Sequence, residues 1–193
     1  MREEKAKARL YIKERLAHVQ DRDRYPESRS LCKQLLKLLP KEPVHICAYF
    51  PLKDEADIRP LLPELLKRGC TLYLPRFAEK KLTFHRADDL DALKPGAFGI
   101  PEPLPTAPQL RPEDLQYALV PARAYDRGCN RLGRGNGGYD IWIRGQRKVN
   151  PTTVFWGVIL EVQLINQVPM EAHDEIVDAV ITARSKIDHP ARS

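Results

Sequence analysis

The sequence predicts an α/β fold: a single three-layer α/β/α domain with a mostly parallel central sheet and an N-terminal helical pair. Short runs of strand-forming residues alternate with segments of helical periodicity, which is typical of a parallel sheet covered by helices. Hydrophobic residues make up 42% of the 193 positions, enough for one sizeable core. Because no internal repeat or low-complexity tail interrupts this pattern, we expect residues 1–193 to form one domain.

The N-terminal region has helical periodicity. A helix over residues 2–19 places four apolar side chains on one stripe, those of Ala8, Ile12, Leu16 and Val19. The polar run at residues 21–26 ends in a proline, which removes a helical hydrogen bond, so we expect a break there. A second helical period begins at Leu31 and ends before Pro40. The chain therefore begins as a helix, a turn and a second helix.

Four short apolar runs predict the central strands. Residues 44–50 and 71–74 are rich in strand-forming residues and flank a helical segment at residues 58–68. Two strands joined in this way pair in parallel, with a right-handed crossover. Residues 117–120 continue the sheet, and residues 153–160 are the most hydrophobic stretch and predict a central strand.

The connection between residues 95 and 112 contains six prolines. Proline fixes φ and lacks a backbone donor, so this density predicts no regular structure and a path over the surface. We expect the sheet to resume only after it, at residues 117–120.

Composition excludes several classes of protein. The longest apolar-looking stretch, residues 149–160, is twelve positions long, against the roughly 20 apolar residues that a membrane helix needs. The first nine residues alternate in charge where a secretory peptide has an apolar region. The four cysteines and five histidines lack the spacing of a disulfide framework or a zinc site, so we expect free thiols. We expect a cytoplasmic monomer with no membrane partner.

The net charge of +6 is concentrated in residues 127–148. This segment holds six basic residues and one acid, Asp140, for a local balance of +5. Such a segment favours an anionic partner. A nucleic-acid-binding module would spread its basic residues more widely, so no nucleic-acid partner is expected.

The same segment is rich in glycine. Five of the ten glycines lie in residues 128–138, which we call the glycine segment, just after the strand expected at residues 117–120. Glycines permit positive φ and a close approach to an anion, so successive N–H groups can form a nest for phosphate, with Arg131 and Arg134 adding charge. A helix starting after the glycines would add its dipole. We interpret the segment as a site for tri- or pyrophosphate, with a mobile basic surface loop as the alternative.

Two common nucleotide-binding motifs do not apply. The pattern G-x-G-x-x-G occurs at Gly133, Gly135 and Gly138, but it lies too far from its strand for a Rossmann fingerprint. The Walker A pattern fails because the chain has no Gly-Lys dipeptide. Asp140 and a second carboxylate are candidates for binding Mg²⁺, which prefers oxygen ligands.

Several collinear motifs resemble those of the 5-formyltetrahydrofolate cyclo-ligases, also called methenyltetrahydrofolate synthetases. The most specific is Asn130-Arg-Leu-Gly-Arg-Gly-Asn-Gly-Gly-Tyr-Asp140, together with residues 120–126 before it. The others are a Lys-x-x-x-Arg pair at Lys5 and Arg9, a Y-x-P-x-x-x-E segment ending at Glu55, and residues 74–76, 96–103, 169–174 and 178–182. The resemblance covers most of the chain.

This resemblance implies a three-layer α/β/α fold and an ATP- and Mg²⁺-dependent reaction. In it, 5-formyltetrahydrofolate becomes 5,10-methenyltetrahydrofolate, with release of ADP and phosphate. Transfer of the γ-phosphoryl group to the formyl oxygen would make that oxygen a leaving group, and positioning and charge neutralisation would carry the step. The implied partners are ATP and a reduced folate, and the implied cofactor is Mg²⁺.

The resemblance also implies roles for individual residues. Arg134 and Lys5 would be catalytic. The residues implied to bind ATP are Lys5, Arg9, Arg131, Leu132, Gly133, Arg134, Gly135, Asn136, Gly137, Gly138 and Tyr139. The residues implied to contact the folate are Phe50, Glu55, Arg134, Gly135, Asn136, Gly137 and Gly138. Mg²⁺ would be held by Asp140 and Asp174.

The chain departs from the family pattern in or near the glycine segment. Gly138 stands where the family usually has the first of two tyrosines. Ala122 and Cys129 each stand where a glycine is expected. The missing ring lies on the folate side, so phosphate and Mg²⁺ binding are better supported than folate turnover.

Each role has an alternative. On spacing alone, Lys5 and Arg9 are solvated cations on a helix flank, and Glu55 is an acid of a first helical turn. Asp140 and Asp174 suit helix ends and turns. For the whole protein, two other functions stay open: a paralogue that binds ATP or a folate without catalysing cyclisation, and a nucleic-acid-binding module.

Overall fold

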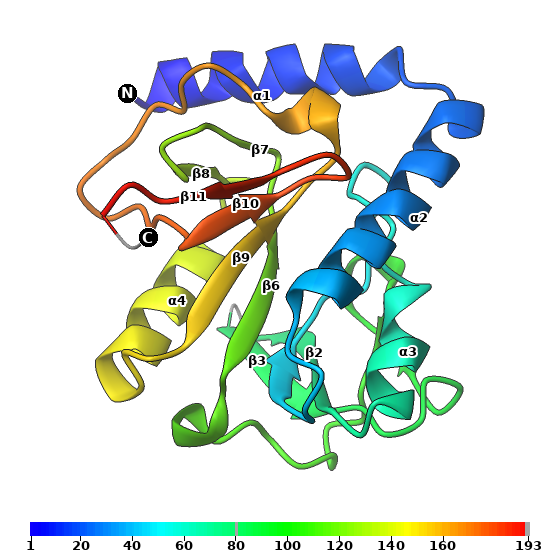
Figure 1. Cartoon of the computed structure of the whole chain (residues 1–193). Helices are drawn as coiled ribbons and strands as arrows, with labels where there is room; N and C mark the ends of the chain where they lie inside the picture. The colour runs from blue at the N-terminus through cyan, green and yellow to red at the C-terminus, as the bar shows by residue number, and fades with distance from the viewer. Residues whose placement is uncertain (80, 192–193) are drawn as a thin grey trace.

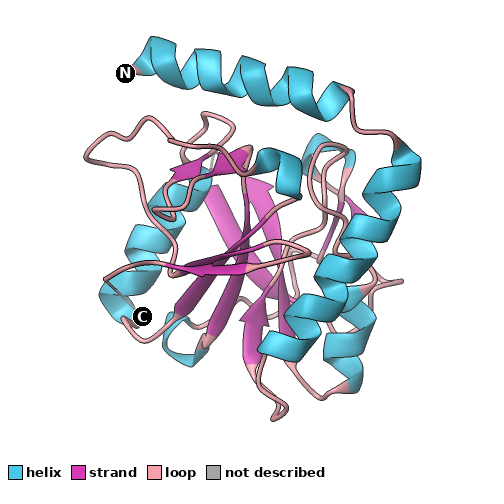
Figure 2. Cartoon of the chain, turned by 45° about the horizontal axis from the view of Figure 1, so that its top comes forward, coloured by secondary structure: helices cyan, strands magenta, loops and turns pink. Residues whose placement is uncertain are grey.

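The computed structural model describes residues 1–79 and 81–191. The described residues form a central sheet with helices on both sides, as Figure 1 and Figure 2 show. The helices are α1 (Arg2–Ala17), α2 (Asp21–Leu38), α3 (Leu61–Lys67) and α4 (Gly138–Val149). Apolar residues of α1, α2 and α3 share one hydrophobic cluster, and α4 packs in the other. The predicted three-layer α/β fold, including the N-terminal helical pair, is confirmed.

The sheet in the described ranges has the strand order β11-β10-β9-β6-β1-β2-β3. Its strands are β1 (His45–Cys47), β2 (Thr71–Ala78), β3 (Lys81–Arg86), β6 (Tyr117–Pro121), β9 (Val154–Val158), β10 (Ala179–Ile181) and β11 (Lys186–Asp188). The strands from β10 to β2 pair in parallel, and the edge strands β11 and β3 are antiparallel. The four predicted strands are β1, β2, β6 and β9, and α3 connects the first two as expected.

Side chains of the central strands alternate between the two faces. In β6, Ala118 and Val120 pack in the cluster that holds α4, whereas Leu119 packs in the cluster that holds α1 to α3. Phe155 and Trp156 of β9 divide in the same way. Because the side-chain period of a strand is two, each face of the sheet is apolar and is covered by helices.

The expected break at residues 21–26 is wrong. α2 begins at Asp21 and contains Pro26, and the chain turns at residues 18–20 instead. Pro26 removes one helical hydrogen bond, the one to the carbonyl of Arg22, and both residues are exposed, so water can reach that carbonyl. Burial of the later turns of α2 outweighs this loss.

The expectation that residues 95–112 lack regular structure is also wrong in part. Lys94–Pro95 (β4) pairs with Pro101–Glu102 (β5), and the short 3-10 helices η1 (Ala97–Gly99) and η2 (Pro112–Asp114) lie in the same connection. These elements are only two or three residues long, so few ladder hydrogen bonds are needed from a proline-rich chain. The hairpin brings Glu102 against β2, where the backbone N–H of Phe77 donates to its carboxylate.

The glycine segment leaves the sheet at the carboxyl end of β6. The chain forms a small hairpin of β7 (Ala124–Tyr125) and β8 (Arg131–Leu132) and then enters α4. A further 3-10 turn, η3 (Glu161–Gln163), follows β9. Ligands of parallel α/β sheets bind at the carboxyl ends of the strands, and the glycine segment lies at that edge.

No helix in the described part of the chain is long and apolar enough to cross a membrane. All four cysteines are buried and free, as their spacing predicts. Burial raises the pKa of the Cys47 thiol well above its ordinary value, so this thiol is unreactive.

Candidate active site

A pocket of about 470 Å³ opens beside the ends of β1, β2 and β6. Much of its wall is apolar and consists of Tyr49, Phe50, Pro75, Phe77, Leu82 and Ile100. Its ionisable and amide side chains include those of Glu55, Glu102, Arg131, Arg134 and Asn136. Of the residues that the sequence analysis assigned to the folate, the structure brings together Phe50, Glu55, Arg134, Asn136 and Gly138. Gly135 and Gly137 do not line the pocket.

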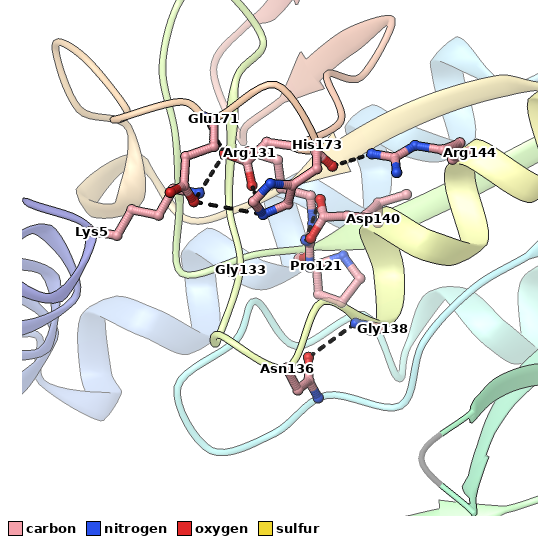
Figure 3. A network of polar contacts seen from close by, with 12 residues as sticks. Lys5, Pro121, Arg131, Gly133, Asn136, Gly138, Asp140, Arg144, Glu171 and His173 are labelled. Carbon is pink, nitrogen blue, oxygen red and sulfur yellow. Dashed lines mark hydrogen bonds and ion pairs between the residues drawn. The ribbon is translucent and has the colours of Figure 1, made fainter. Parts of the chain in front are cut away.

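The backbone of the glycine segment requires glycine at two positions. Gly135 and Gly137 have φ angles of +105° and +67°, in the region that side chains disfavour. Gly137 is the N-cap of α4, and the side chain of Asn136 accepts a hydrogen bond from the N–H of Gly138 at 3.3 Å (Figure 3). The segment therefore turns sharply into the helix, with N–H groups at the helix start available for an anion.

α1 lies against the glycine segment through Arg9. The Nε of Arg9 donates to the carbonyl of Gly133 at 2.9 Å. A Cβ atom on Gly135 would lie 3.5 Å from the guanidinium carbon of Arg9, so the two residues are in close contact. The structure thus joins two motifs that are more than a hundred residues apart in the sequence.

Three arginines meet beside the pocket: Arg9, Arg123 and Arg134. Arg134 donates to Glu55 Oε1 from Nε at 3.2 Å and from Nη2 at 3.0 Å, and both Arg134 and Arg123 form ion pairs with Asp54. Burial lowers the pKa of Arg123, and the positive charges of Arg134 and Arg9 lower it further. Three cations against two carboxylates leave a positive excess that suits an anionic ligand.

The sequence analysis missed Arg123. Its position in the sequence could have indicated it. Arg123 follows the predicted strand at residues 117–120 by three residues, so it lies at the carboxyl edge of the sheet. No spacing rule links it to Arg9 or Arg134, and only the fold brings the three together.

Arg131 is buried and makes its polar contacts within the protein, so it is not an exposed cation. Its Nη1 lies 3.1 and 3.0 Å from the two carboxylate oxygens of Asp140, and its Nε donates to the carbonyl of Pro121 at 3.3 Å. Its guanidinium also lies over the ring of Tyr139, 5.0 Å from the centroid. A Cβ on Gly133 would lie 2.8 Å from Arg131 Nη1, so a side chain there would displace the guanidinium of Arg131. Arg131 therefore links the glycine segment to β6 and α4.

Leu132, also expected in the ATP site, is a core residue. Its side chain is 1% exposed and packs in the cluster shared with α1. Its carbonyl accepts a hydrogen bond from the backbone N–H of Arg123 at 2.8 Å, so Leu132 belongs to the β7–β8 hairpin rather than to a binding surface.

Lys5 lies between two acidic side chains. Its Nζ is 2.7 Å from Glu171 and 2.5 Å from Asp174. Burial lowers the pKa of Lys5, but the hydrogen bonds and charges of Asp174 and Glu171 outweigh this and leave it raised. For Asp174, burial raises the pKa, and Lys5 reverses the shift so that the pKa is lowered. Both groups are therefore charged at neutral pH.

The same acids could hold a metal ion. Glu171, His173 and Asp174 offer ligand atoms that all lie within 4.8 Å of one another. Carboxylate oxygens are the ligands that Mg²⁺ prefers, so Glu171 and Asp174 fit this ion, whereas the imidazole of His173 does not. Figure 3 shows Glu171 and His173 of this group near Lys5, and it shows Arg131 with Asp140. Asp174 belongs to the group, whereas Asp140, the other expected ligand, is held by Arg131.

Comparison with known proteins decides the family. A sequence model of the 5-formyltetrahydrofolate cyclo-ligase family matches residues 1–183. The chain belongs to the 5-formyltetrahydrofolate cyclo-ligase family. The 5-formyltetrahydrofolate cyclo-ligase of Mycolicibacterium smegmatis is 33% identical over 150 residues, which cover 74% of this chain and 75% of that protein. A probable cyclo-ligase of Schizosaccharomyces pombe is 27% identical over 178 residues, 83% of this chain and 86% of that protein.

Solved structures agree with the family assignment. The 5,10-methenyltetrahydrofolate synthetase of Aquifex aeolicus superposes with a TM-score of 0.82 and 30% identity, and the match covers 96% of this chain and 93% of that one. A 5,10-methenyltetrahydrofolate synthetase of Mycoplasma pneumoniae has the same fold, with a TM-score of 0.74 at 16% identity over 93% of this chain and 98% of that one.

Two departures of this cyclo-ligase family member from the family pattern have clear structural settings. Cys129 has φ of +60°, the left-handed conformation for which glycine is the usual residue. Gly138 does not have a positive φ, and a Cβ there would lie 3.8 Å from each of Phe77, Leu82 and Asn136. A side chain at position 138 would therefore fit and would stand against the pocket wall.

Proposed function

We propose that the protein catalyses the ATP- and Mg²⁺-dependent cyclisation of 5-formyltetrahydrofolate to 5,10-methenyltetrahydrofolate, with release of ADP and phosphate. One observation carries this proposal: an apolar pocket adjoins the cluster of Arg9, Arg123 and Arg134, and Arg134 belongs to both. Pockets of 300–1,000 Å³ with a few polar groups are typical of small-molecule sites. A ring system in the pocket would have its reacting group beside the cations.

The reaction suits this arrangement. The oxygen of an N-formyl group is a poor leaving group, and transfer of the γ-phosphoryl group of ATP to it forms an iminium phosphate. N10 of the folate then attacks the formyl carbon and loses its proton to solvent or to a phosphate oxygen, the ring closes, and phosphate departs with the oxygen. Arg134 would stabilise the charge that develops on the transferred phosphoryl group, while Arg9 and the glycine segment bind the remaining phosphates.

The acids around Lys5 support the metal part of the proposal. Mg²⁺ would be held by Asp174, with Glu171 beside it, and by Asp140 once Asp140 exchanges its ion pair with Arg131 for the metal, and would neutralise charge on the triphosphate. Lys5, between Glu171 and Asp174, would bring its own charge to the same phosphates. All of these groups belong to elements that meet at the glycine segment.

An absorbance assay tests the proposal. Purified protein is mixed with 5-formyltetrahydrofolate, and formation of the methenyl product is followed with ATP and Mg²⁺ together, with each alone, and with neither. We expect product only when both are present, because phosphoryl activation requires the nucleotide and its metal. Equal product without nucleotide would contradict the proposal.

A second candidate function has a specific observation in its favour. Gly138 leaves the pocket without a ring that the family pattern supplies, which favours a paralogue that binds ATP or a folate without efficient turnover. Measuring the binding of both ligands alongside turnover separates the two: tight binding with no product identifies the paralogue.

The hypothesis of a nucleic-acid-binding module is less well supported, because much of the basic segment forms ion pairs within the protein. Arg131, Arg144 and Arg147 all form ion pairs with carboxylates outside the arginine cluster. Their charge is therefore less available to a phosphate backbone. We further propose that residues 1–193 act as one monomeric domain in the cytoplasm, where four free thiols are normal.

A further inference from the structure

We propose that Glu102 recognises the donor edge of the reduced pterin ring and so orients the folate in the pocket. This inference rests on the proposed function and names one contact within it. Glu102 lies in the motif at residues 96–103, for which the family resemblance implies no role.

Glu102 is a buried carboxylate in the apolar part of the pocket. It is 3% exposed, and Pro75, Phe77 and Ile100 line the pocket with it. Burial of a carboxylate costs free energy unless hydrogen bonds and charge compensate for it. The pocket wall therefore contains a hydrogen-bond acceptor whose desolvation costs free energy, at a place where an apolar side chain would fill the same space at no such cost.

The backbone and one arginine fix the position of this carboxylate. Its Oε1 accepts hydrogen bonds from the backbone N–H of Phe77 at 3.3 Å and of Ala97 at 3.1 Å. Its Oε2 lies 3.6 Å from Arg76 Nη1, which donates to the carbonyl of Pro103. A Cβ on Gly96 would lie within 2.5 Å of Oε2, so only glycine there leaves room for the carboxylate.

Glu102 and Glu55 differ in the acceptor capacity that they leave for a ligand. Oε1 of Glu55 accepts two hydrogen bonds from Arg134, and Oε2 accepts one from the backbone N–H of Leu52 at 3.0 Å. Oε2 of Glu102 has, among the described residues, the ion pair to Arg76 at a distance longer than a hydrogen bond. Glu102 is thus the carboxylate better able to accept from a bound molecule.

The reduced pterin ring carries matching donors. Its 2-amino group and N3–H lie side by side on one edge, and a carboxylate accepts from such an edge with charge-assisted hydrogen bonds. Contact at Oε2 would fix which way the ring enters the pocket. The orientation matters, because the formyl group lies on the other ring of the bicycle and has to face the arginine cluster.

Binding and kinetics of Glu102→Gln test the inference. The amide keeps the shape of the side chain but places an N–H₂ group or a neutral oxygen against the ligand donors. We expect the KM and Kd for 5-formyltetrahydrofolate to rise about 10- to 100-fold, while Mg-ATP binding changes little. Glu113→Gln, the same change at an exposed position on η2, is the matched control and should leave both constants unchanged.

A substrate analogue gives a test that does not depend on the variant folding. Wild-type protein should bind the 2-desamino analogue of 5-formyltetrahydrofolate about 10- to 100-fold more weakly than the parent compound. Folded Glu102→Gln should lose most of this discrimination. Equal binding of parent and analogue by the wild type overturns the inference, as does normal folate binding by Glu102→Gln. These two outcomes leave the proposed function intact. If the wild-type protein does not bind the parent folate, the inference and the proposed function are both overturned.

Discussion

Residues 127–148 divide into two halves with equal numbers of basic side chains but different surroundings. The first half, residues 127–138, holds Arg127, Arg131 and Arg134, and the second half, residues 139–148, holds Arg144, Arg147 and Lys148. The fold brings further cations, Arg9 and Arg123, to the first half. To the second half it brings carboxylates: Glu175 pairs with Arg144 at 3.0 Å and with Arg147 at 2.9 Å, and Asp178 lies 3.6 Å from Arg147.

The difference separates a candidate anion site from a structural ion-pair network. In the second half, Asp178 also accepts from the backbone N–H of Phe155 at 2.7 Å, so the arginines of α4 fasten that helix to β9 and the segment after it. In the first half, Arg134 faces a pocket and shares one acid, Asp54, with Arg123. Charge density along a sequence therefore shows where cations lie, and tertiary contacts decide which of them remain available to a ligand.

Substitution of Arg134 should have the largest effect. We expect Arg134→Ala to lower kcat/KM by about 10²- to 10³-fold, because it removes a preorganised charge beside the transferred phosphoryl group. The kcat/KM of Arg134→Lys should lie between those of wild type and Arg134→Ala, because lysine keeps the charge but loses the planar guanidinium that binds Glu55.

The matched control for this substitution is Arg144→Ala in the second half. Its partner Glu175 keeps Arg147, and the side chain of Arg144 is 41% exposed, so we expect kcat/KM within about threefold of wild type. Thermal unfolding of each variant checks that the fold is kept. If both variants weaken ligand binding alike and moderate salt abolishes the difference from wild type, the segment is a diffuse basic surface that binds polyanions, not a defined anion site.

Asp140 connects the two halves and should show a smaller effect, on stability. It lies near the start of the second half, but its carboxylate neutralises Arg131 of the first half, whose side chain is 6% exposed. Asp140→Asn leaves that guanidinium buried without its counter-charge, so we expect a loss of about 2–3 kcal/mol in the free energy of unfolding.

Denaturant unfolding of Asp140→Asn measures this loss, and Asp114→Asn is its control. Asp114 pairs with Arg111 at the surface, where such a pair contributes less than about 1 kcal/mol. Equal stability of the two variants would show that Arg131 does not depend on Asp140. A Mg²⁺ titration of turnover in the same variants tests the proposed metal role separately, because a lost ligand raises the Mg²⁺ concentration required.

The sequence predicted the fold well wherever elements were long or strongly apolar. The strands β1, β2, β6 and β9 and the helices α1 and α3 had clear patterns, whereas α2 was expected only from Leu31 and α4 only as a helix start after the glycines. The strands β10 and β11 are three residues each, too short for a period-two pattern, and β3 is an edge strand with a mixed pattern. Pro26 was misread as a break because local propensity does not include the later burial that stabilises α2.

The candidate site was predicted only as far as motifs reach. The resemblance located Phe50, Glu55 and Arg134, which do line one pocket. It could not show that Arg131 is bound by Asp140, nor that Arg123 joins Arg9 and Arg134, because these contacts depend on how α1, β6 and the glycine segment pack. Long-range ion pairs carry no local sequence signal.

Two glycines give the finest comparison of the halves, and the smallest expected effect. Gly138 ends the first half against the pocket, whereas Gly145 lies on the exposed face of α4 in the second half, with no atom within 4 Å of a built Cβ. A ring at position 138 could pack on a bound pterin, and such contacts are worth about 0.5–1.5 kcal/mol. Replacing glycine also reduces the chain entropy lost when the segment is ordered, by up to about 1 kcal/mol. Gly138→Tyr should therefore lower the folate Kd by about tenfold and affect ATP binding less.

The same substitution at position 145 should change only stability. Gly145→Tyr improves helix propensity by a few tenths of a kcal/mol and should leave folate binding at the wild-type value. Isothermal titration with 5-formyltetrahydrofolate and with Mg-ATP measures both variants against the wild type. Because Gly138 has an ordinary φ and its added Cβ would make only van der Waals contacts, backbone strain cannot account for a loss at that position. If Gly138→Tyr abolishes folate binding that the wild type has, the pocket is adapted to glycine, and a paralogue of altered specificity becomes the better account of the protein.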